Sequence, residues 1–288
     1  METGEAVAQI LKGKEVADAM MEQMRADVAT LKGNGTEPVL AIVRAGARED
    51  DLAYERGAMK RAEAAGVAVK QVVLDEDVSQ EDFEKAFREV NSDETVHGIL
   101  LMQPLPKQLD REKIRAMFHP EKDVDGCTDL SLAGVFTNTE TGFPPCTAQA
   151  VMEMLHHYNV EIRGKKAAVI GRSLVIGRPV AMLLMHENAT VVNCHTGTAD
   201  VPAITREADI LIAAAGKLRS VTKDYTNPEQ VVIDVGINWD EEKGSIAGDV
   251  DFETTEPYVK AITPVPGGIG AVTTCVLISH VIKAAKRA

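Results

Sequence analysis

The chain has 288 residues, of which 45% are hydrophobic and 26% are charged, proportions typical of a globular protein that buries a core. Its formal net charge is −13 and no basic cluster interrupts it, which disfavours binding to nucleic acid or to an anionic membrane. No apolar run reaches the roughly 20 residues that a membrane span needs, and residues 1–10 lack the pattern of a signal peptide.

The cysteines are scattered along the chain, without a C-x-x-C pair and without metal-ligand spacing. They are Cys127, Cys146, Cys194 and Cys275. We therefore expect buried free thiols, no metal site and a reducing, cytoplasmic environment.

The first half of the sequence alternates helical and strand-like patterns. In chain order it predicts a helix over 15–31, a strand over 38–43, a helix over 51–65 closed by Gly66, a strand over 69–74, a helix over 81–91 and a strand over 98–102. Such alternation indicates parallel β/α units.

A second series follows Gly164, after a turn-rich stretch (123–147) and a predicted helix over 148–158. Its predicted strands cover 167–170, 190–194, 210–214, 231–235 and 261–263, and a last helix covers 272–286. We predict two α/β lobes with a cleft between them. Residues 1–147, completed by the C-terminal helix (272–288), form one domain, and residues 148–271 form a second domain with a Rossmann-like parallel sheet.

The clearest local motif is a glycine turn that follows a buried strand. Residues 166–170 run into Gly171-Arg-Ser-Leu-Val-Ile-Gly177-Arg-Pro179. Gly171 permits a sharp turn, Gly177 lets a helix approach the sheet, and the amides at the helix N-terminus can hold a pyrophosphate. The spacing G-x-S-x-x-x-G differs from G-x-G-x-x-G, so the turn alone also fits a strand–turn–helix without nucleotide.

The end of the next predicted strand indicates which dinucleotide binds. NAD sites usually place a carboxylate there to hold the ribose 2′-hydroxyl. Here residues 194–198 read Cys-His-Thr-Gly-Thr, with no carboxylate. The hydroxyls of Thr196 and Thr198, together with Arg172, suit a 2′-phosphate, which favours NADP. We assign no chemistry to His195.

These residues and several further segments resemble the methylenetetrahydrofolate dehydrogenase/cyclohydrolase family, which is often bifunctional and usually homodimeric. The matching segments, in the order of the family, are Lys122-Asp-Val-Asp-Gly126, Pro145-Cys-Thr147, Val169-Ile-Gly-Arg-Ser173, Val232-Ile-Asp-Val-Gly-Ile-Asn238, Gly248-Asp-Val250 and Ile262-Thr-Pro-Val-Pro-Gly-Gly-Ile-Gly270. The combination of K-D-V-D-G with T-P-V-P-G-G is specific.

The resemblance implies roles for individual residues. Asp125 matches the aspartate that recognises the pterin, and a carboxylate can accept two hydrogen bonds from an aminopyrimidine edge. Tyr54 matches the tyrosine that stacks on the folate linker. These two are the expected catalytic and substrate-binding residues, with Gly267 and Gly270 in a loop that approaches the folate. The positions expected to contact NADP are Gly171, Arg172, Ser173, Thr196 and Ile237.

The sequence departs from the bifunctional pattern around Tyr54. Asp51 and Ala58 occupy the places of a serine and a lysine, and Met102 occupies that of a glutamine, with Gln103 one residue later. Lys60 lies about 240° from Tyr54 around a helix, so it points away, and the guanidinium of Arg61 does not act as a base.

The two activities of the family need different chemistry. Hydride transfer depends mainly on positioning, whereas hydrolysis of the methenyl cation needs a base for water and a proton for the leaving nitrogen. We therefore predict an NADP-dependent 5,10-methylenetetrahydrofolate dehydrogenase whose cyclohydrolase activity is lost or weak. The alternatives are a bifunctional enzyme that uses an unrecognised group, a non-catalytic folate- or nucleotide-binding protein, and an unrelated Rossmann dehydrogenase.

Overall fold

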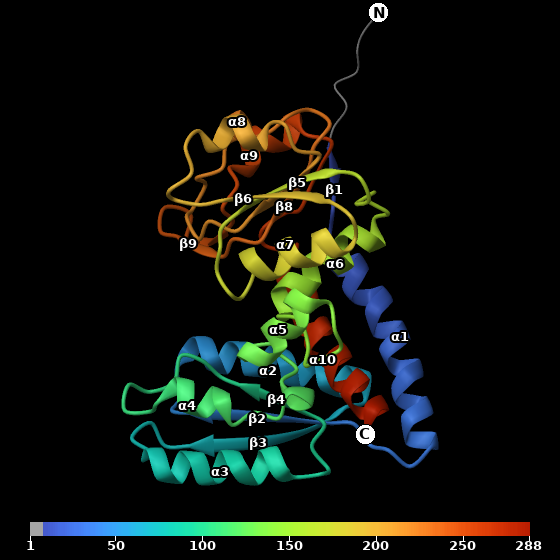
Figure 1. Cartoon of the computed structure of the whole chain (residues 1–288), viewed down its shortest axis with the longest axis vertical. Coiled ribbons are helices and arrows are strands. Elements are labelled where there is room, and N and C mark those ends of the chain that lie inside the picture. Colours follow the sequence, from blue (N-terminus) through green and yellow to red (C-terminus); the bar gives the residue numbers. More distant parts are fainter. Residues whose placement is uncertain (1–7) are drawn as a thin grey trace, which may run out of the picture. The chain divides into compact units, whose positions relative to one another are not determined.

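The structure, a computed structural model, describes residues 8–288 (Figure 1). Its contacts divide the chain into two compact units. The six-stranded unit contains the described residues up to Ala17 and Thr147–Thr273, and the three-stranded unit contains Asp18–Cys146 and Thr274–Ala288. Residues 8–17 correct one expected boundary, because they belong with the second sheet and not with the first domain.

The six-stranded unit is a parallel sheet in the order β1-β11-β8-β7-β5-β6. Its strands are β1 (Gln9–Ile10), β5 (Lys166–Ile170), β6 (Thr190–Cys194), β7 (Ile210–Ala213), β8 (Val231–Asp234) and β11 (Ala261–Ile262). The predicted parallel Rossmann-like sheet is therefore confirmed. The sequence pattern missed β1, because two residues are too few to show a periodicity.

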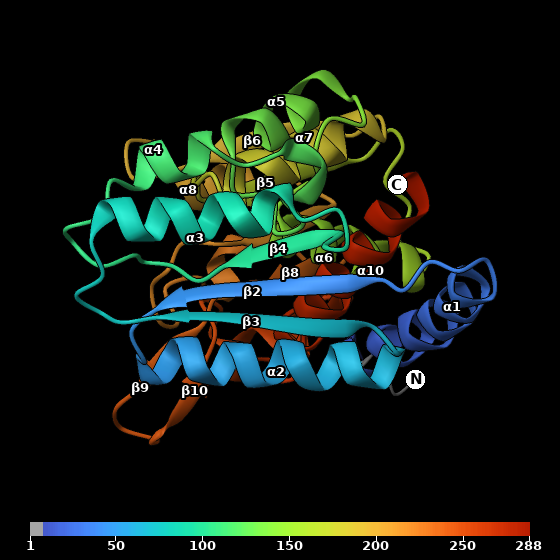
Figure 2. The same ribbon diagram turned by 90° about the horizontal axis from the view of Figure 1, so that it is seen from below.

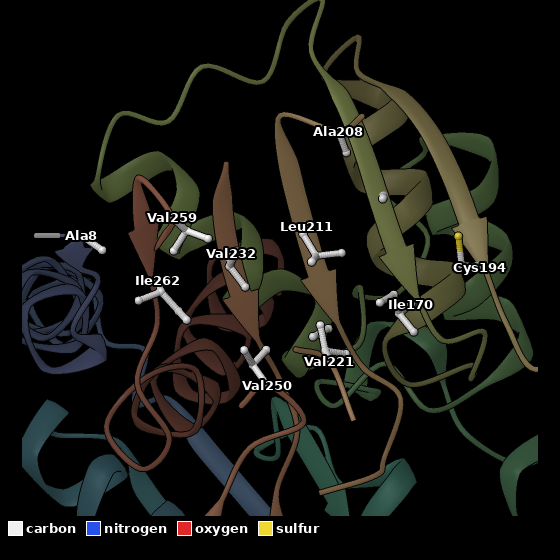
Figure 3. Packing of buried hydrophobic residues seen from close by; sticks show 12 residues of the cluster. Ala8, Ile170, Cys194, Ala208, Leu211, Val221, Val232, Val250, Val259 and Ile262 are labelled. Atoms are coloured by element: carbon white, nitrogen blue, oxygen red, sulfur yellow. The ribbon is translucent and has the colours of Figure 1, made fainter. Parts of the chain in front are cut away.

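Helices cover both faces of this sheet, which explains the unbroken apolar runs of its strands. In Figure 1, α6 (Cys146–His157) and α7 (Gly177–His186) lie on one side, and α8 (Val201–Thr205) and α9 (Phe252–Thr255) lie on the other. One core cluster, shown in Figure 3, joins Ile170, Leu211, Val232 and Ile262 from four neighbouring strands. A hairpin of β9 (Asn238–Asp240) and β10 (Ser245–Ala247) extends the unit and was not predicted.

The three-stranded unit has the parallel strand order β3-β2-β4. Its strands are β2 (Val39–Ala45), β3 (Ala68–Leu74) and β4 (Gly98–Leu101). Figure 2 shows α2 (Glu49–Ala65) and α3 (Gln80–Ser92) on opposite sides of this sheet. The predicted end of α2 is confirmed, since Gly66 closes the helix with φ 81°.

The three-stranded unit also contains two short helices and a single helical turn, and two long helices cross the unit boundary. They are α4 (Arg111–Ala116), α5 (Asp129–Thr137), the single turn at Pro120–Lys122, α1 (Gly13–Gly33) and α10 (Gly270–Arg287). Lys286 of α10 pairs with Asp27 of α1 at 2.9 Å inside the three-stranded unit. None of the helices in residues 8–288 is long and apolar enough to cross a membrane.

An aromatic cluster holds α3 against the three-stranded sheet. Phe83 and Phe87 are fully buried and stack at 6.4 Å between ring centroids, and Phe87 meets Phe118 edge-on at 4.8 Å. The cluster packs on Ala41 and Val43 of β2. Burial of these rings is therefore a main source of stability for this unit.

Replacing Phe87 by alanine should destabilise the protein by about 3–5 kcal/mol, because it removes a buried ring and leaves a cavity. Urea denaturation followed by far-UV circular dichroism measures this as a lower transition midpoint. The control is Val73→Ala on β3, where the side chain is 51% exposed and a loss below about 1 kcal/mol is expected. Equal losses in the two variants would contradict the assignment of Phe87 to the core.

Candidate functional site

The K-D-V-D-G segment forms a loop whose residues are held by different parts of the three-stranded unit. Lys122 donates from Nζ to the carbonyl oxygens of Asn91 and Asp93, both at 2.8 Å. These carbonyls lie at the C-terminal end of α3, where a cation also interacts favourably with the helix dipole. The first residue of the motif thus ties the loop to α3.

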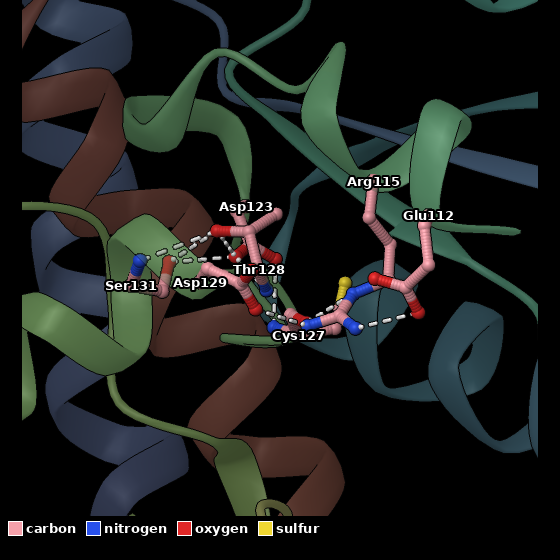
Figure 4. Close-up of polar contacts among 7 residues, drawn as sticks. All are labelled: Glu112, Arg115, Asp123, Cys127, Thr128, Asp129 and Ser131. Carbon is pink, nitrogen blue, oxygen red and sulfur yellow. Dashed lines mark hydrogen bonds and ion pairs between the residues drawn. The ribbon is translucent and has the colours of Figure 1, made fainter.

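Asp123 is the internal anchor of the loop (Figure 4). Its carboxylate is fully buried and accepts from the amides of Cys127 (3.0 Å) and Thr128 (2.9 Å) and from the hydroxyls of Thr128 (2.7 Å) and Ser131 (2.6 Å). Four donors satisfy an acceptor that burial alone would penalise. Nearby, Arg115 donates to the Cys127 carbonyl at 2.8 Å and pairs with Asp129 at 3.0 Å.

The loop turns at Gly126, where φ is 67°. A Cβ at this position would lie 2.5 Å from the Pro145 nitrogen and 2.6 Å from the Phe143 carbonyl oxygen. Glycine is therefore required both for the backbone conformation and for the close approach of residues 143–145.

Asp125 differs from its neighbours because its carboxyl is not used to hold the loop. Burial raises its pKa to about 7, the negative charge of Asp123 adds to this, and hydrogen bonding with Cys146 opposes it. The side chain remains partly exposed. A desolvated carboxyl with little internal pairing is suited to binding a ligand that supplies donors.

Tyr54 lies on α2 within electrostatic reach of Asp125. Burial raises the pKa of its phenol well above the ordinary value, and the charges of Asp125 and Cys146 raise it further. Asp125, predicted to recognise the pterin, and Tyr54, predicted to stack on the folate linker, thus belong to the same unit and interact electrostatically. The three-stranded unit therefore offers an aromatic ring within electrostatic reach of a carboxyl.

The positions that depart from the bifunctional pattern are buried. Ala58 is fully buried on α2, and Met102, directly after β4, is 6% exposed. Asp51 is also buried, with its carboxylate 3.9 Å from Arg48. Lys60 is exposed. Within residues 8–288, the groups that shift the pKa values of Tyr54 and Asp125 are carboxyl and thiol groups, and none of them is a lysine or an arginine.

In the six-stranded unit, the glycine turn lies where the strand order reverses, between β5 and β7. This is the place where open α/β sheets bind ligands. Gly171 has φ 125°, and a Cβ there would lie 2.2 Å from the carbonyl oxygen of Ala214, which follows β7. A Cβ at Gly177 would lie 2.3 Å from the Gly171 carbonyl oxygen. Both glycines are therefore needed for close backbone packing.

The predicted cofactor residues stand around this turn. Ile170 of β5 pairs in register with Cys194 of β6, so Arg172 and Thr196 each lie two residues past the same point of the sheet. Both are exposed. The Ser173 hydroxyl accepts from the Ile176 amide at 3.2 Å and so shapes the turn before α7.

Two buried aspartates hold the loops that follow β7 and β8. Asp234 accepts from the amides of Gly236 (2.9 Å), Asp249 (3.0 Å) and Val250 (2.9 Å). Burial raises its pKa to about 6, although these three donors act in the opposite direction. Asp249 in turn accepts from the amides of Gly216 and Lys217, both at 2.9 Å. These hydrogen bonds hold the segments at the C-terminal ends of β7 and β8 in place.

The remaining predicted positions are in the same unit. Ile237 is 68% exposed just after β8. The Gly267 carbonyl accepts from the Gly13 amide at 2.8 Å, and Gly270 begins α10. A cavity of about 280 Å³ lies beside this loop, lined among others by Asp234, Arg219 and Pro264–Pro266. Arg219 is already paired with Asp240.

Sequence reasoning missed several residues that support these sites. Asp123, Asp234 and Asp249 lie in the quoted motifs. The signal that the sequence offered for them was a glycine close to each aspartate. His280, which donates to the loop from α10, carried no motif signal. The four cysteines are free, as expected, and Cys127 is only partly buried.

Comparison with known proteins agrees with both parts of this description. Residues 11–125 match the catalytic domain of tetrahydrofolate dehydrogenase/cyclohydrolase, and residues 145–288 match its NAD(P)-binding domain. The chain is 52% identical to the bifunctional protein FolD of Carboxydothermus hydrogenoformans, over 96% of this chain and 97% of that protein.

Solved structures show the same similarity. The bifunctional enzyme FolD from Campylobacter jejuni is 35% identical with a TM-score of 0.93, over 97% of this chain and 99% of that one. The Trypanosoma brucei dehydrogenase-cyclohydrolase, complexed with NADP and an inhibitor, is 35% identical with a TM-score of 0.90, over 98% of each chain. The chain belongs to the tetrahydrofolate dehydrogenase/cyclohydrolase family.

Proposed function

We propose that this protein is an NADP-dependent 5,10-methylenetetrahydrofolate dehydrogenase. The observation that carries the proposal is the Asp125 carboxyl of the K-D-V-D-G loop, which is desolvated and interacts electrostatically with Tyr54. An aminopyrimidine edge offers the two donors that such a carboxylate can accept. Family membership and the glycine turn of the six-stranded unit support the redox half of the proposal.

In this reaction NADP, when bound, accepts a hydride from the one-carbon bridge of the folate. The residues of this chain contribute by positioning, because the folate nitrogens supply the electrons. Asp125 fixes the pterin, and Tyr54 presents its ring to the folate linker. The backbone around Gly171 and Ser173 receives the pyrophosphate at the N-terminus of α7.

Preference for NADP over NAD rests on the end of β6. Residues 194–198 contain no carboxylate that would repel a 2′-phosphate. Arg172 and Thr196 are exposed, each two residues past the end of neighbouring strands, and they supply a cation and a hydroxyl. A guanidinium is well matched to a phosphate.

Cyclohydrolase activity is the second candidate function. The similar proteins from C. hydrogenoformans and C. jejuni are both named bifunctional, which favours it. The buried Ala58 argues in the other direction, because a methyl group transfers no proton. An assay with purified 5,10-methenyltetrahydrofolate distinguishes a bifunctional enzyme from a dehydrogenase alone. Hydrolysis well above the rate in buffer establishes the cyclohydrolase activity, and hydrolysis at the buffer rate rules it out.

A homodimer in the cytoplasm is proposed on family resemblance alone.

The dehydrogenase itself is tested by NADP reduction at 340 nm with methylenetetrahydrofolate, compared with NAD. Arg172→Ala should raise the KM for NADP about 10- to 100-fold, since a charge-assisted bond to phosphate is lost. The KM for NAD should change less than about threefold. Arg163→Ala, at an exposed arginine of the same unit, is the matched control. Equal effects on both cofactors would refute the assignment to the 2′-phosphate.

Folate binding should depend on pH through Asp125. Because its pKa is raised to about 7, the carboxylate that accepts from the pterin is fully formed only above this pH. The KM for methylenetetrahydrofolate, measured at saturating NADP, should therefore rise about tenfold between pH 8 and pH 6. The groups that face this carboxyl are Asp123, Cys146 and Tyr54.

Asp125→Asn should raise this KM at pH 8 and abolish its dependence on pH, because the amide does not titrate. Glu81→Gln, at an exposed carboxyl of α3, should leave the profile of the parent protein unchanged. A pH dependence that persists in Asp125→Asn would assign the titration to another group.

A further inference from the structure

A buried histidine from the end of the chain contacts the folate-binding loop. His280 lies on α10 and is 1% exposed. Its Nδ1 lies 2.8 Å from the carbonyl oxygen of Val124, and its ring stacks on Phe143 at 4.8 Å with an interplanar angle of 28°. All three residues belong to the three-stranded unit.

The contact defines the protonation of the ring. A carbonyl oxygen can only accept, so Nδ1 must carry the proton and donate it. Burial lowers the pKa of His280 to about 3, and the charges of Lys283 and Arg287 act in the same direction. The ring is therefore neutral at physiological pH and offers one N–H, which it gives to Val124.

A second donor reaches the same carbonyl. The Cys146 thiol lies 3.3 Å from the Val124 oxygen and 3.9 Å from His280 Nδ1. Cys146 also interacts with Asp125: burial raises the pKa of the thiol, and the negative charge of Asp125 raises it further. The carbonyl is thus fixed from two sides, and one of its donors also contacts the carboxyl that would bind the folate.

The Val124 carbonyl directly precedes Asp125 in the backbone, so a contact with it also affects Asp125. The oxygen of Val124 and the amide nitrogen of Asp125 belong to one peptide group, which is planar. Fixing that oxygen fixes the orientation of the plane and the position of the Asp125 Cα within it, which limits the directions in which the side chain can leave the backbone. Lys122, Asp123 and Gly126 hold the loop, but none of them acts on this peptide plane directly.

We propose that His280 is a positioning residue for the folate site: its Nδ1–H holds the Val124–Asp125 peptide plane and so aims the Asp125 carboxyl at the pterin. The inference deepens the proposed dehydrogenase function and rests on it. A histidine that only filled space would contribute by its volume and its stacking on Phe143, and the donor would be irrelevant.

Substitutions can separate the donor from the volume. His280→Phe keeps an aromatic ring against Phe143 but has no N–H, and His280→Leu is a second apolar variant without a ring. His280→Asn supplies a side-chain N–H at a similar distance from the backbone and should restore the bond. Lys283→Ala, at an exposed residue of the same helix, is the control.

The test is steady-state kinetics of all four variants, with thermal unfolding measured in parallel to choose a temperature at which each is folded. His280→Phe and His280→Leu should raise the KM for methylenetetrahydrofolate about tenfold and leave the KM for NADP within about twofold. His280→Asn and Lys283→Ala should keep the folate KM within about threefold of the parent value.

The inference is overturned if the apolar variants keep the parent folate KM, if they raise the KM values of both ligands equally, or if His280→Asn fails as completely as His280→Phe. If one apolar variant does not fold, the other gives the comparison with His280→Asn. Absence of dehydrogenase activity in the parent protein would count against the proposed function instead. In that case, calorimetric titration of tetrahydrofolate into the same variants applies the same criteria to its Kd.

Discussion

The buried carboxylate of Asp123 is the interaction on which the candidate folate site depends. Its four donors come from residues 127–131, so the chain must fold back around one charge before α5 can begin. A carboxylate removed from water is tolerated only when its acceptors are satisfied. Satisfying this one inside the loop leaves the neighbouring Asp125 carboxyl available to a ligand. The motif thus contains two aspartates in different settings: Asp123 is used in folding, and Asp125 is the residue proposed to bind the pterin.

The six-stranded unit solves a similar problem in the same way. Asp234 and Asp249 accept from backbone amides in the segments after β7, β8 and β10, so these segments keep their shape. Arg172 and Thr196 remain exposed. In both units buried carboxylates organise the backbone, while the groups proposed to bind the ligands are left with little internal pairing. Burial also raises the pKa of Asp125 and of Asp234, because it removes their carboxyl groups from water.

Much of this could be predicted from the sequence, because it is encoded locally. Strand and helix periodicities gave the major elements of both sheets, and Gly66 and Gly171 marked turns that only glycine adopts easily. Long-range partners could not be predicted. Strand β1 has two residues and exists because β11 pairs with it, and His280 reaches Val124 across 156 positions of sequence. A regular helical pattern does not reveal which buried side chain makes a polar contact with a distant loop.

The close packing at Gly98 connects the K-D-V-D-G loop to the three-stranded sheet. A Cβ on this first residue of β4 would lie 2.6 Å from the Val124 side chain and 3.0 Å from that of Val281. The loop is therefore built into the hydrophobic interior and does not act as a movable lid. The entropy of ordering it is lost when the protein folds, before any substrate arrives, so association with the pterin does not have to supply that part of the free energy.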